Sequence, residues 1–429
     1  MSIARTVDTH WKRIVAILTA GWIVIWIYRT ALTPIYPVIS KFFGGVSDAA
    51  LGSISSFYFL GYVIMQIPSG LLVDRFGQRR VIIPGFSVFA LGTLVVALAT
   101  ELPMMYVGSV LAGIGCGTFY GVAYSLTAEY VPEEKKSLST AVVNSGMAVG
   151  SGFGLVSSSF LVGRGIIPWQ WLVLATTVLC VAMLVVFGTF IKAKRAAGAG
   201  AGASGAAGGA AGGEAAGAAG GAAAVAAPRK HSLRDLFAPQ MIAAYVLYFS
   251  TMYAYYLIDT WLPNFLETER GFAGTAVGLA SSLVFFSAIP GALVFSRLAD
   301  KIPHRKVAII VVLELVAAGM LMFTMQAPNQ TLVVVGIVAY GFFGKLAVEP
   351  IIISWLSQFA SGGSVATMYG VFNFFGMTSS VLAPTVTGAI SDATGSKIVG
   401  FYLAVCIILA GTALFFIVNR VCSAKRAAA

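Results

Sequence analysis

The sequence predicts an all-α membrane protein with twelve transmembrane helices in two pseudo-symmetric six-helix bundles. The prediction rests on composition, on two groups of apolar runs, and on a weak internal repeat. Of the 429 residues, 58% are hydrophobic and 10% are charged, whereas a soluble domain is about a quarter charged. Twelve spans of about 20 residues need about 240 apolar positions, which this composition supplies. An ordinary soluble enzyme is excluded, because too few polar side chains are available to cover its surface.

The apolar runs form two groups of six on either side of a segment rich in alanine and glycine. The first group lies at about 14–37, 50–73, 81–100, 103–131, 138–163 and 169–191, and the second at about 239–266, 273–299, 306–326, 330–359, 366–391 and 397–419. Between them, Glu214 is the one charge in an Ala-Gly tract, which has no side chains to pack. We therefore expect an N-terminal bundle at 1–192, a flexible cytoplasmic linker at 193–235 and a C-terminal bundle at 236–429.

The positions of Lys and Arg predict the orientation. With the N-terminus inside, cytoplasmic segments hold twenty-one of these residues and outside segments hold four, Lys41, Arg164, Arg270 and Lys397. Cytoplasmic loops carry the excess of positive charge, so both termini are expected in the cytoplasm and the protein in the plasma membrane. This topology explains the net charge of +11 without a nucleic-acid partner. No small-residue cleavage site follows the basic N-terminus, so the first run is expected to be a retained span.

Motifs for metals, nucleotides and redox chemistry are missing from the sequence. The four cysteines lack CxxC spacing and are interpreted as small buried apolar residues. The glycines of Gly113–Gly117 suit close helix packing rather than phosphate binding, and there is no Walker A pattern. We therefore expect no cofactor, no metal and no ATP-driven pump. The three histidines lie in connecting segments, so any proton would be carried by a carboxylate.

The two halves repeat each other weakly, and the repeat contains a known signature. Residues 70–80 read GLLVDRFGQRR, and residues 296–306 share several of its positions; Asn144 likewise matches Asn373. The first stretch resembles the G-x-L-x-D-R-x-G-R-R signature of the major facilitator superfamily, except at Gln78. The resemblance implies that fold and a cytoplasmic latch between the bundles, formed by Asp74, Arg75, Arg79, Asp300 and Arg305. The alternative is a simple positive anchor at the cytoplasmic face.

A narrower resemblance is to the anion:cation symporter branch of that superfamily, which includes sugar-acid transporters. It rests on TWLPNFLE at 260–267, GVFNFFG at 370–376 with LAP at 382–384, and a lone Arg29 in the first run. The resemblance implies symport of a small organic anion with protons by alternating access, and no enzymatic activity. One position departs from the pattern, because Tyr28 stands where sugar-acid members carry an acidic residue. Any proton-carrying role of that residue must lie elsewhere or be absent.

Charged residues inside the apolar runs are the candidate functional groups, because each costs about 2.5–3.5 kcal/mol at the bilayer centre. Arg29, Glu129, Asp259, Lys345 and Glu349 fall in the first, fourth, seventh and tenth runs, which the family places around a central cavity. Arg29 suits a carboxylate, which its fork can bind with two hydrogen bonds; a permanent salt bridge is the alternative. Asp259 lies at the repeat-equivalent position and is a candidate proton carrier.

Other candidates carry open alternatives. Lys345 and Glu349 are four residues apart and share a helical face; they are either a self-neutralising pair or a substrate anchor with a proton carrier. Glu129 either pairs with the signature arginines or takes part in proton coupling. Glu314 lies on a helix that the family places at the periphery, and the sequence assigns it no role. Polar side chains that could hydrogen-bond a substrate, or pack locally instead, are Tyr120, Tyr124, Tyr256, Asn144 and Asn373.

The sequence thus predicts a monomeric proton-coupled symporter of a small organic carboxylate in the lipid bilayer. The first alternative is a drug/proton antiporter of the same fold, although the glycine-rich stretch Gly150–Gly154 lacks the proline usual in such exporters. The second is a membrane receptor, which would need a folded soluble partner domain that the tether and the short tails do not provide.

Overall fold

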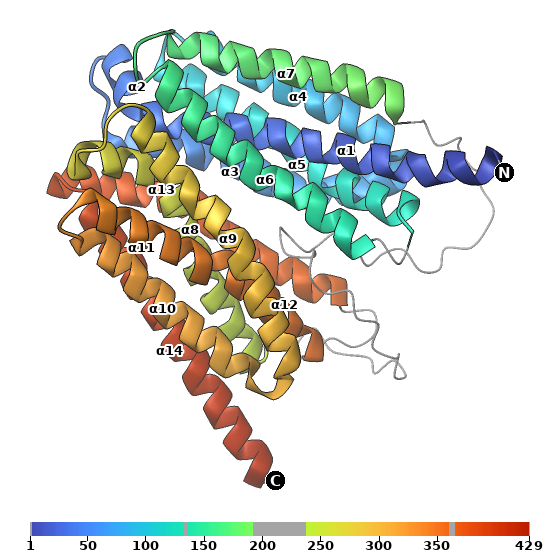
Figure 1. The fold of residues 1–429 in the computed structure, drawn as a ribbon, viewed down its shortest axis with the longest axis vertical. Helices are drawn as coiled ribbons and strands as arrows, with labels where there is room; N and C mark the ends of the chain where they lie inside the picture. The colour runs from blue at the N-terminus through green and yellow to red at the C-terminus, as the bar shows by residue number, and fades with distance from the viewer. Residues whose placement is uncertain (1, 133–135, 192–236, 360–364, 429) are drawn as a thin grey trace. The chain divides into compact units, whose positions relative to one another are not determined.

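The computed structural model describes residues 2–132, 136–191, 237–359 and 365–428, and within these ranges every regular element is helical (Figure 1). The predicted linker at 193–235 lies outside the described residues. In the N-terminal half the elements are α1 (Ser2–Ala31), η1 (Thr33–Ile35), α2 (Tyr36–Phe42), α3 (Asp48–Phe76), α4 (Gln78–Ala97), α5 (Leu102–Tyr130), α6 (Lys136–Leu161) and α7 (Trp169–Phe190). In the C-terminal half they are α8 (Pro239–Arg270), α9 (Thr275–Lys301), η4 (Pro303–Arg305), α10 (Lys306–Gln326), α11 (Gln330–Phe343), α12 (Lys345–Leu356), η5 (Ser357–Phe359), α13 (Val365–Thr394) and α14 (Ile398–Ala428).

The helices account for all twelve predicted spans. Ten segments of the described chain are long and apolar enough to cross a membrane. The fifth and eleventh predicted runs are the long helices α6 and α13, whose many Gly, Ser and Thr residues lower their mean hydropathy. Large apolar side chains such as Trp171, Val178 and Val185 on α7 are exposed, as expected for a surface that faces lipid.

The chain divides into two compact units. The described residues of the first unit fall within 1–46 and 53–191, and those of the second within 47–52 and 237–428. In the first unit α1 packs along α6, and α4 packs against α5 and α7. The α1–α6 contact is close because Gly146, Gly150 and Gly154 bring α6 against the α1 backbone, where an added Cβ would lie 2.7 Å or less from a neighbouring atom.

The second unit is built around α8. This helix packs against α13 and α14, while α9 and α10 both contact α11 and α12 (Figure 1). Nearly all of α8 from Leu247 to Leu266 is buried, so the polar and charged side chains on it must find partners inside the protein. The candidate site of the second unit develops from this helix.

Two spans are interrupted. The first span breaks after α1, where Pro34 and Pro37 begin the short elements η1 and α2 and cannot donate a helical hydrogen bond. The tenth span breaks at Gly344, between α11 and α12. Interrupted spans are where transporters place substrate and ion sites, and each of these two breaks lies beside a candidate charged residue.

Candidate functional site

The break at Gly344 places two charged side chains at the start of α12. Lys345 is the first residue of that helix and Glu349 lies one turn later. Their side chains are 2% and 1% exposed, and Lys345 Nζ lies 3.3 Å from a Glu349 carboxylate oxygen. This geometry is compatible with both alternatives for the pair. Lys345 and Glu349 neutralise each other as they stand, and a charged substrate could also compete for either partner.

Two tyrosines on α8 face this pair. The Tyr248 hydroxyl donates a hydrogen bond to Glu349 Oε1, and Lys345 Nζ lies 4.6 Å from the centre of the Tyr255 ring, within cation–π range. Tyr248 and Tyr255 are seven residues apart, which puts them on the same face of a helix. Sequence reasoning missed both residues, although this spacing on a predicted span was the signal that could have found them.

Tyr248 is held in place by α13. Its ring stacks on Phe372 with the ring centres 3.9 Å apart. A Cβ added at Gly376 would lie 2.2 Å from the Tyr248 ring, so only glycine allows α13 to approach this closely. The GVFNFFG stretch therefore has a packing role in the second unit, where it sets the position of the hydroxyl that bonds Glu349.

Arg29 lies near the end of α1, just before the break in the first span, and is partly buried. Its guanidinium carbon lies 3.7 Å from the centre of the Trp26 ring and 4.4 Å from that of Phe59 on α3. Both distances are within cation–π range. The role of Arg29 as an anion anchor stays a prediction.

The other predicted residues of the second unit are buried on α8 and α13. Asp259 is 5% exposed and lies four residues before Pro263, which cannot donate to the Asp259 carbonyl. Asn373 on α13 is 7% exposed. The Tyr256 hydroxyl contacts Met377 Sδ at 3.2 Å.

In the first unit, Tyr120 on α5 is buried and Asn144 on α6 is partly buried. The side chain of Tyr124 lies outside the described part of the chain, and so does that of Asp74. Of the other predicted latch residues, Arg75, Asp300 and Arg305 are exposed and Arg79 is partly exposed. The latch stays a prediction.

Gln78, the residue that departs from the family signature, has a defined contact. Its amide nitrogen donates to Glu129 Oε2 at 2.7 Å and to Ser125 Oγ at 2.9 Å, both on α5. Glu129 was expected to pair with the signature arginines or to couple protons. The structure shows Gln78 as a partner of Glu129, so the departing residue itself joins the signature loop to the fourth span.

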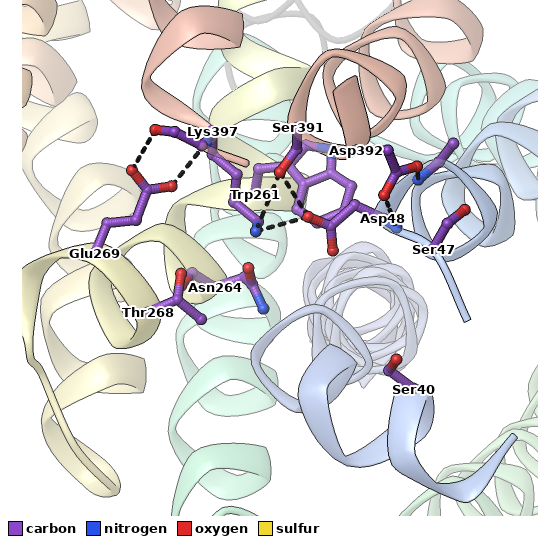
Figure 2. A network of polar contacts seen from close by, with 12 residues as sticks. Ser40, Ser47, Asp48, Trp261, Asn264, Thr268, Glu269, Ser391, Asp392 and Lys397 are labelled. Atoms are coloured by element: carbon purple, nitrogen blue, oxygen red, sulfur yellow. Dashed lines mark hydrogen bonds and ion pairs between the residues drawn. The ribbon is translucent and has the colours of Figure 1, made fainter. Parts of the chain in front are cut away.

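A further polar network lies where α13 meets α14 (Figure 2). Asp48 Oδ2 accepts hydrogen bonds from Lys397 Nζ at 2.8 Å and from Ser391 Oγ at 2.6 Å. The Asp392 carboxylate accepts from the backbone N–H groups of Asp48 and Ala49, at 2.7 and 2.8 Å. Asp392 therefore caps the N-terminus of α3, where a negative charge is favourable.

Lys397 also joins this network to α8. Its backbone N–H donates to Glu269 Oε1 at 2.7 Å, and Ser396 Oγ donates to Glu269 Oε2 at the same distance. Lys397 Nζ lies 5.4 Å from the Trp261 ring centre (Figure 2). These bonds explain why residues 47–52 belong to the second unit. The network could not be predicted from the sequence, because the three segments that form it, around Asp48, Glu269 and Ser391–Lys397, are more than a hundred residues apart.

In the described residues, Lys345 and Glu349 are buried beside an interrupted span, which is where transporters place substrate and ion sites. The family comparison agrees, because the model of the Major Facilitator Superfamily matches residues 18–384 and, separately, 244–427. The chain belongs to the Major Facilitator Superfamily.

Similar proteins include transporters with two kinds of substrate. The chain is 24% identical to the quinolone resistance transporter of Acinetobacter baumannii, covering 87% of this chain and 86% of that one. It is 23% identical to the probable galactarate/D-glucarate transporter GarP of Escherichia coli strain K12, covering 80% of both. It is 29% identical to the gallate transporter of Pseudomonas putida, covering 70% of this chain and 68% of that one.

The fold is also that of a solved structure. A bacterial homologue of the human lysosomal transporter Spinster, in an inward-facing and occupied conformation, superposes with a TM-score of 0.75 at 15% identity, covering 95% of this chain and 96% of that chain. At this identity the likeness is one of fold.

Proposed function

We propose that this protein is a secondary active transporter that carries a small organic anion together with protons by alternating access. It would act in the plasma membrane with both termini in the cytoplasm, as the Lys and Arg bias indicates. The observation that carries the proposal is the buried Lys345–Glu349 pair at the break between α11 and α12. The names of the galactarate/D-glucarate and gallate transporters support a carboxylate substrate.

In this proposal the substrate carboxylate binds to cationic groups beside the interrupted spans. Lys345 is the first residue of α12, so its ammonium and the positive end of the helix dipole act together on an anion. Arg29 of the first unit, whose guanidinium lies within cation–π range of Trp26 and Phe59, is the other cationic anchor of the proposal. The polar groups of the substrate would bond to Tyr120, Tyr124, Tyr256, Asn144 and Asn373.

Coupling follows from competition for the same cation. An anion that binds Lys345 takes the place of the Glu349 carboxylate, and Glu349 is then free to accept a proton. Loss of the anion restores the ion pair and releases the proton. Tyr248 keeps Glu349 positioned through its hydroxyl. Asp259 and Glu129 are the further proton carriers of the proposal, and Asp74, Arg75, Arg79, Asp300 and Arg305 form its cytoplasmic latch.

Uptake of labelled galactarate, tartrate and gallate into proteoliposomes tests the anchor. Replacing Arg29 by Ala removes charge-assisted hydrogen bonds of about 1.5–3 kcal/mol, so uptake should fall at least tenfold at subsaturating substrate. Arg29→Lys keeps the charge without the fork and should retain part of the activity. Arg164→Ala, at an exposed position, is the matched control and should transport normally. Unchanged uptake by Arg29→Ala would contradict the assignment.

A drug/proton antiporter is the second candidate function. The similarity to a quinolone resistance transporter over most of both chains favours it. The two candidates differ in the direction in which protons move when substrate enters, which is the measurement described at the end of the Discussion.

A further inference from the structure

Glu314 is a buried carboxyl group for which the proposed transport cycle has no use. It lies in the middle of α10 and is 1% exposed. A carboxylate at such a depth must be paired with a cation or lose its charge, because an isolated ion is strongly disfavoured in a medium of low polarity.

The helices around α10 offer Glu314 no cation. Among the described residues its one hydrogen-bond partner is Thr251 on α8, and none forms a salt bridge with it. From α11, Tyr340 lies within electrostatic range. From α12, Lys345 is engaged by Glu349. On α14, which packs along α10, the stretch 398–419 contains no Asp, Glu, Lys, Arg or His, and its Cys406 is exposed.

The basic residues at the start of α10 are also too far away or already engaged. His304 and Arg305 in η4 lie about nine residues before Glu314, which is about 14 Å along a helix axis. Lys306 is closer by one residue, but its ammonium donates to Ser354 Oγ at 2.6 Å. Within the part of the chain that the structure describes, Glu314 therefore forms no ion pair, and its hydrogen-bond partner Thr251 is neutral.

The contacts of the Thr251 hydroxyl indicate which group donates each hydrogen bond around Glu314. Its hydroxyl contacts both Glu314 Oε1 and the carbonyl oxygen of Leu247, the latter at 3.0 Å. A threonine hydroxyl has one proton to donate, and both of these partners are acceptors if Glu314 is ionised. Both contacts are hydrogen bonds when Glu314 carries a proton, because its carboxyl O–H then donates to Thr251, and Thr251 donates to Leu247.

We infer that Glu314 is a proton-binding site of the second unit. Its carboxyl group carries a proton and is hydrogen-bonded to the Thr251 hydroxyl. The site is separate from the Lys345–Glu349 pair, but both are joined to the same part of α8, since Tyr248 bonds Glu349 and Thr251 bonds Glu314 three residues later. The inference does not require that transport be coupled to protons.

Infrared spectroscopy of the protein in liposomes at neutral pH tests the inference without substrate or gradient. The carbonyl stretch of a protonated carboxylic acid is recorded for the wild-type protein, Glu314→Gln and Glu349→Gln. We expect Glu314→Gln to lose one protonated carboxyl per chain relative to the wild type, and Glu349→Gln to keep it. An undiminished band in folded Glu314→Gln protein would overturn the inference.

Variants of Thr251 provide a second test if Glu314→Gln does not fold. Thr251→Val removes the hydroxyl and should shift the carboxylic acid band, because the acid loses its hydrogen-bond acceptor. Thr251→Ser keeps the hydroxyl and should leave the band in place. A Thr251→Val spectrum identical to that of the wild type would overturn the assignment of the band to Glu314.

Discussion

At the scale of single residues, variants of the Lys345–Glu349 pair distinguish a role in stability from a role in transport. Replacing Lys345 by Met leaves a buried carboxylate without its cation, which costs about 3–5 kcal/mol when a buried pair is broken from one side. Replacing both, as Lys345→Met with Glu349→Leu, removes both charges and should restore much of the stability. Thermal melting of the purified variants measures both effects.

The transport assay on the same variants distinguishes the two interpretations of the pair. If Lys345 anchors the anion, the double variant should melt close to the wild type but fail to accumulate carboxylates. A double variant that transports as well as the wild type would show that the pair only neutralises itself.

At the scale of elements, the approach of α13 to α8 determines where Tyr248 lies. Gly376→Ala introduces a Cβ 2.2 Å from the Tyr248 ring, so the ring and its hydroxyl must move away from Glu349. We expect uptake to fall severalfold and the melting temperature to drop, since overpacking costs about 1–3 kcal/mol. Uptake and thermal melting of the purified variant check this.

The matched control is Gly319→Ala on α10, where an added Cβ meets nothing within 4 Å. This variant should transport normally and melt at or above the wild-type temperature, because alanine favours helix more than glycine does. Equal behaviour of the two alanine variants would mean that the closeness of α13 to α8 has no consequence for Tyr248.

The helices could be predicted from the sequence, but the break at Gly344 and the contacts between distant residues could not. Apolar runs of spanning length identified the spans, since hydrophobic length is a property of each segment by itself. The break at Gly344 has no proline to mark it. The contacts Gln78–Glu129, Thr251–Glu314 and Asp48–Lys397 join residues 51 to 349 positions apart, and one sequence contains no record of such pairings.

At the scale of the whole molecule, the predicted fold and family are confirmed. The candidate site was predicted in part. Charges in apolar runs pointed to Arg29, Lys345 and Glu349 because such residues are costly in a bilayer. The aromatic side chains beside them were missed. The seven-residue spacing of Tyr248 and Tyr255 on a predicted span was a signal, whereas nothing in the sequence distinguishes Trp26 and Phe59 from the many aromatic residues that pack in any membrane protein.

The central claim is that anion entry carries protons in the same direction, and proton movement driven by substrate alone tests it most directly. Proteoliposomes containing a pH-sensitive dye are held at equal pH inside and outside, and a galactarate, tartrate or gallate gradient is then applied from outside. The account predicts acidification of the interior, which Glu349→Gln should abolish and Gly319→Ala should preserve. Carboxylate uptake without acidification, or alkalinisation driven by an external quinolone with no response to any carboxylate, would contradict it.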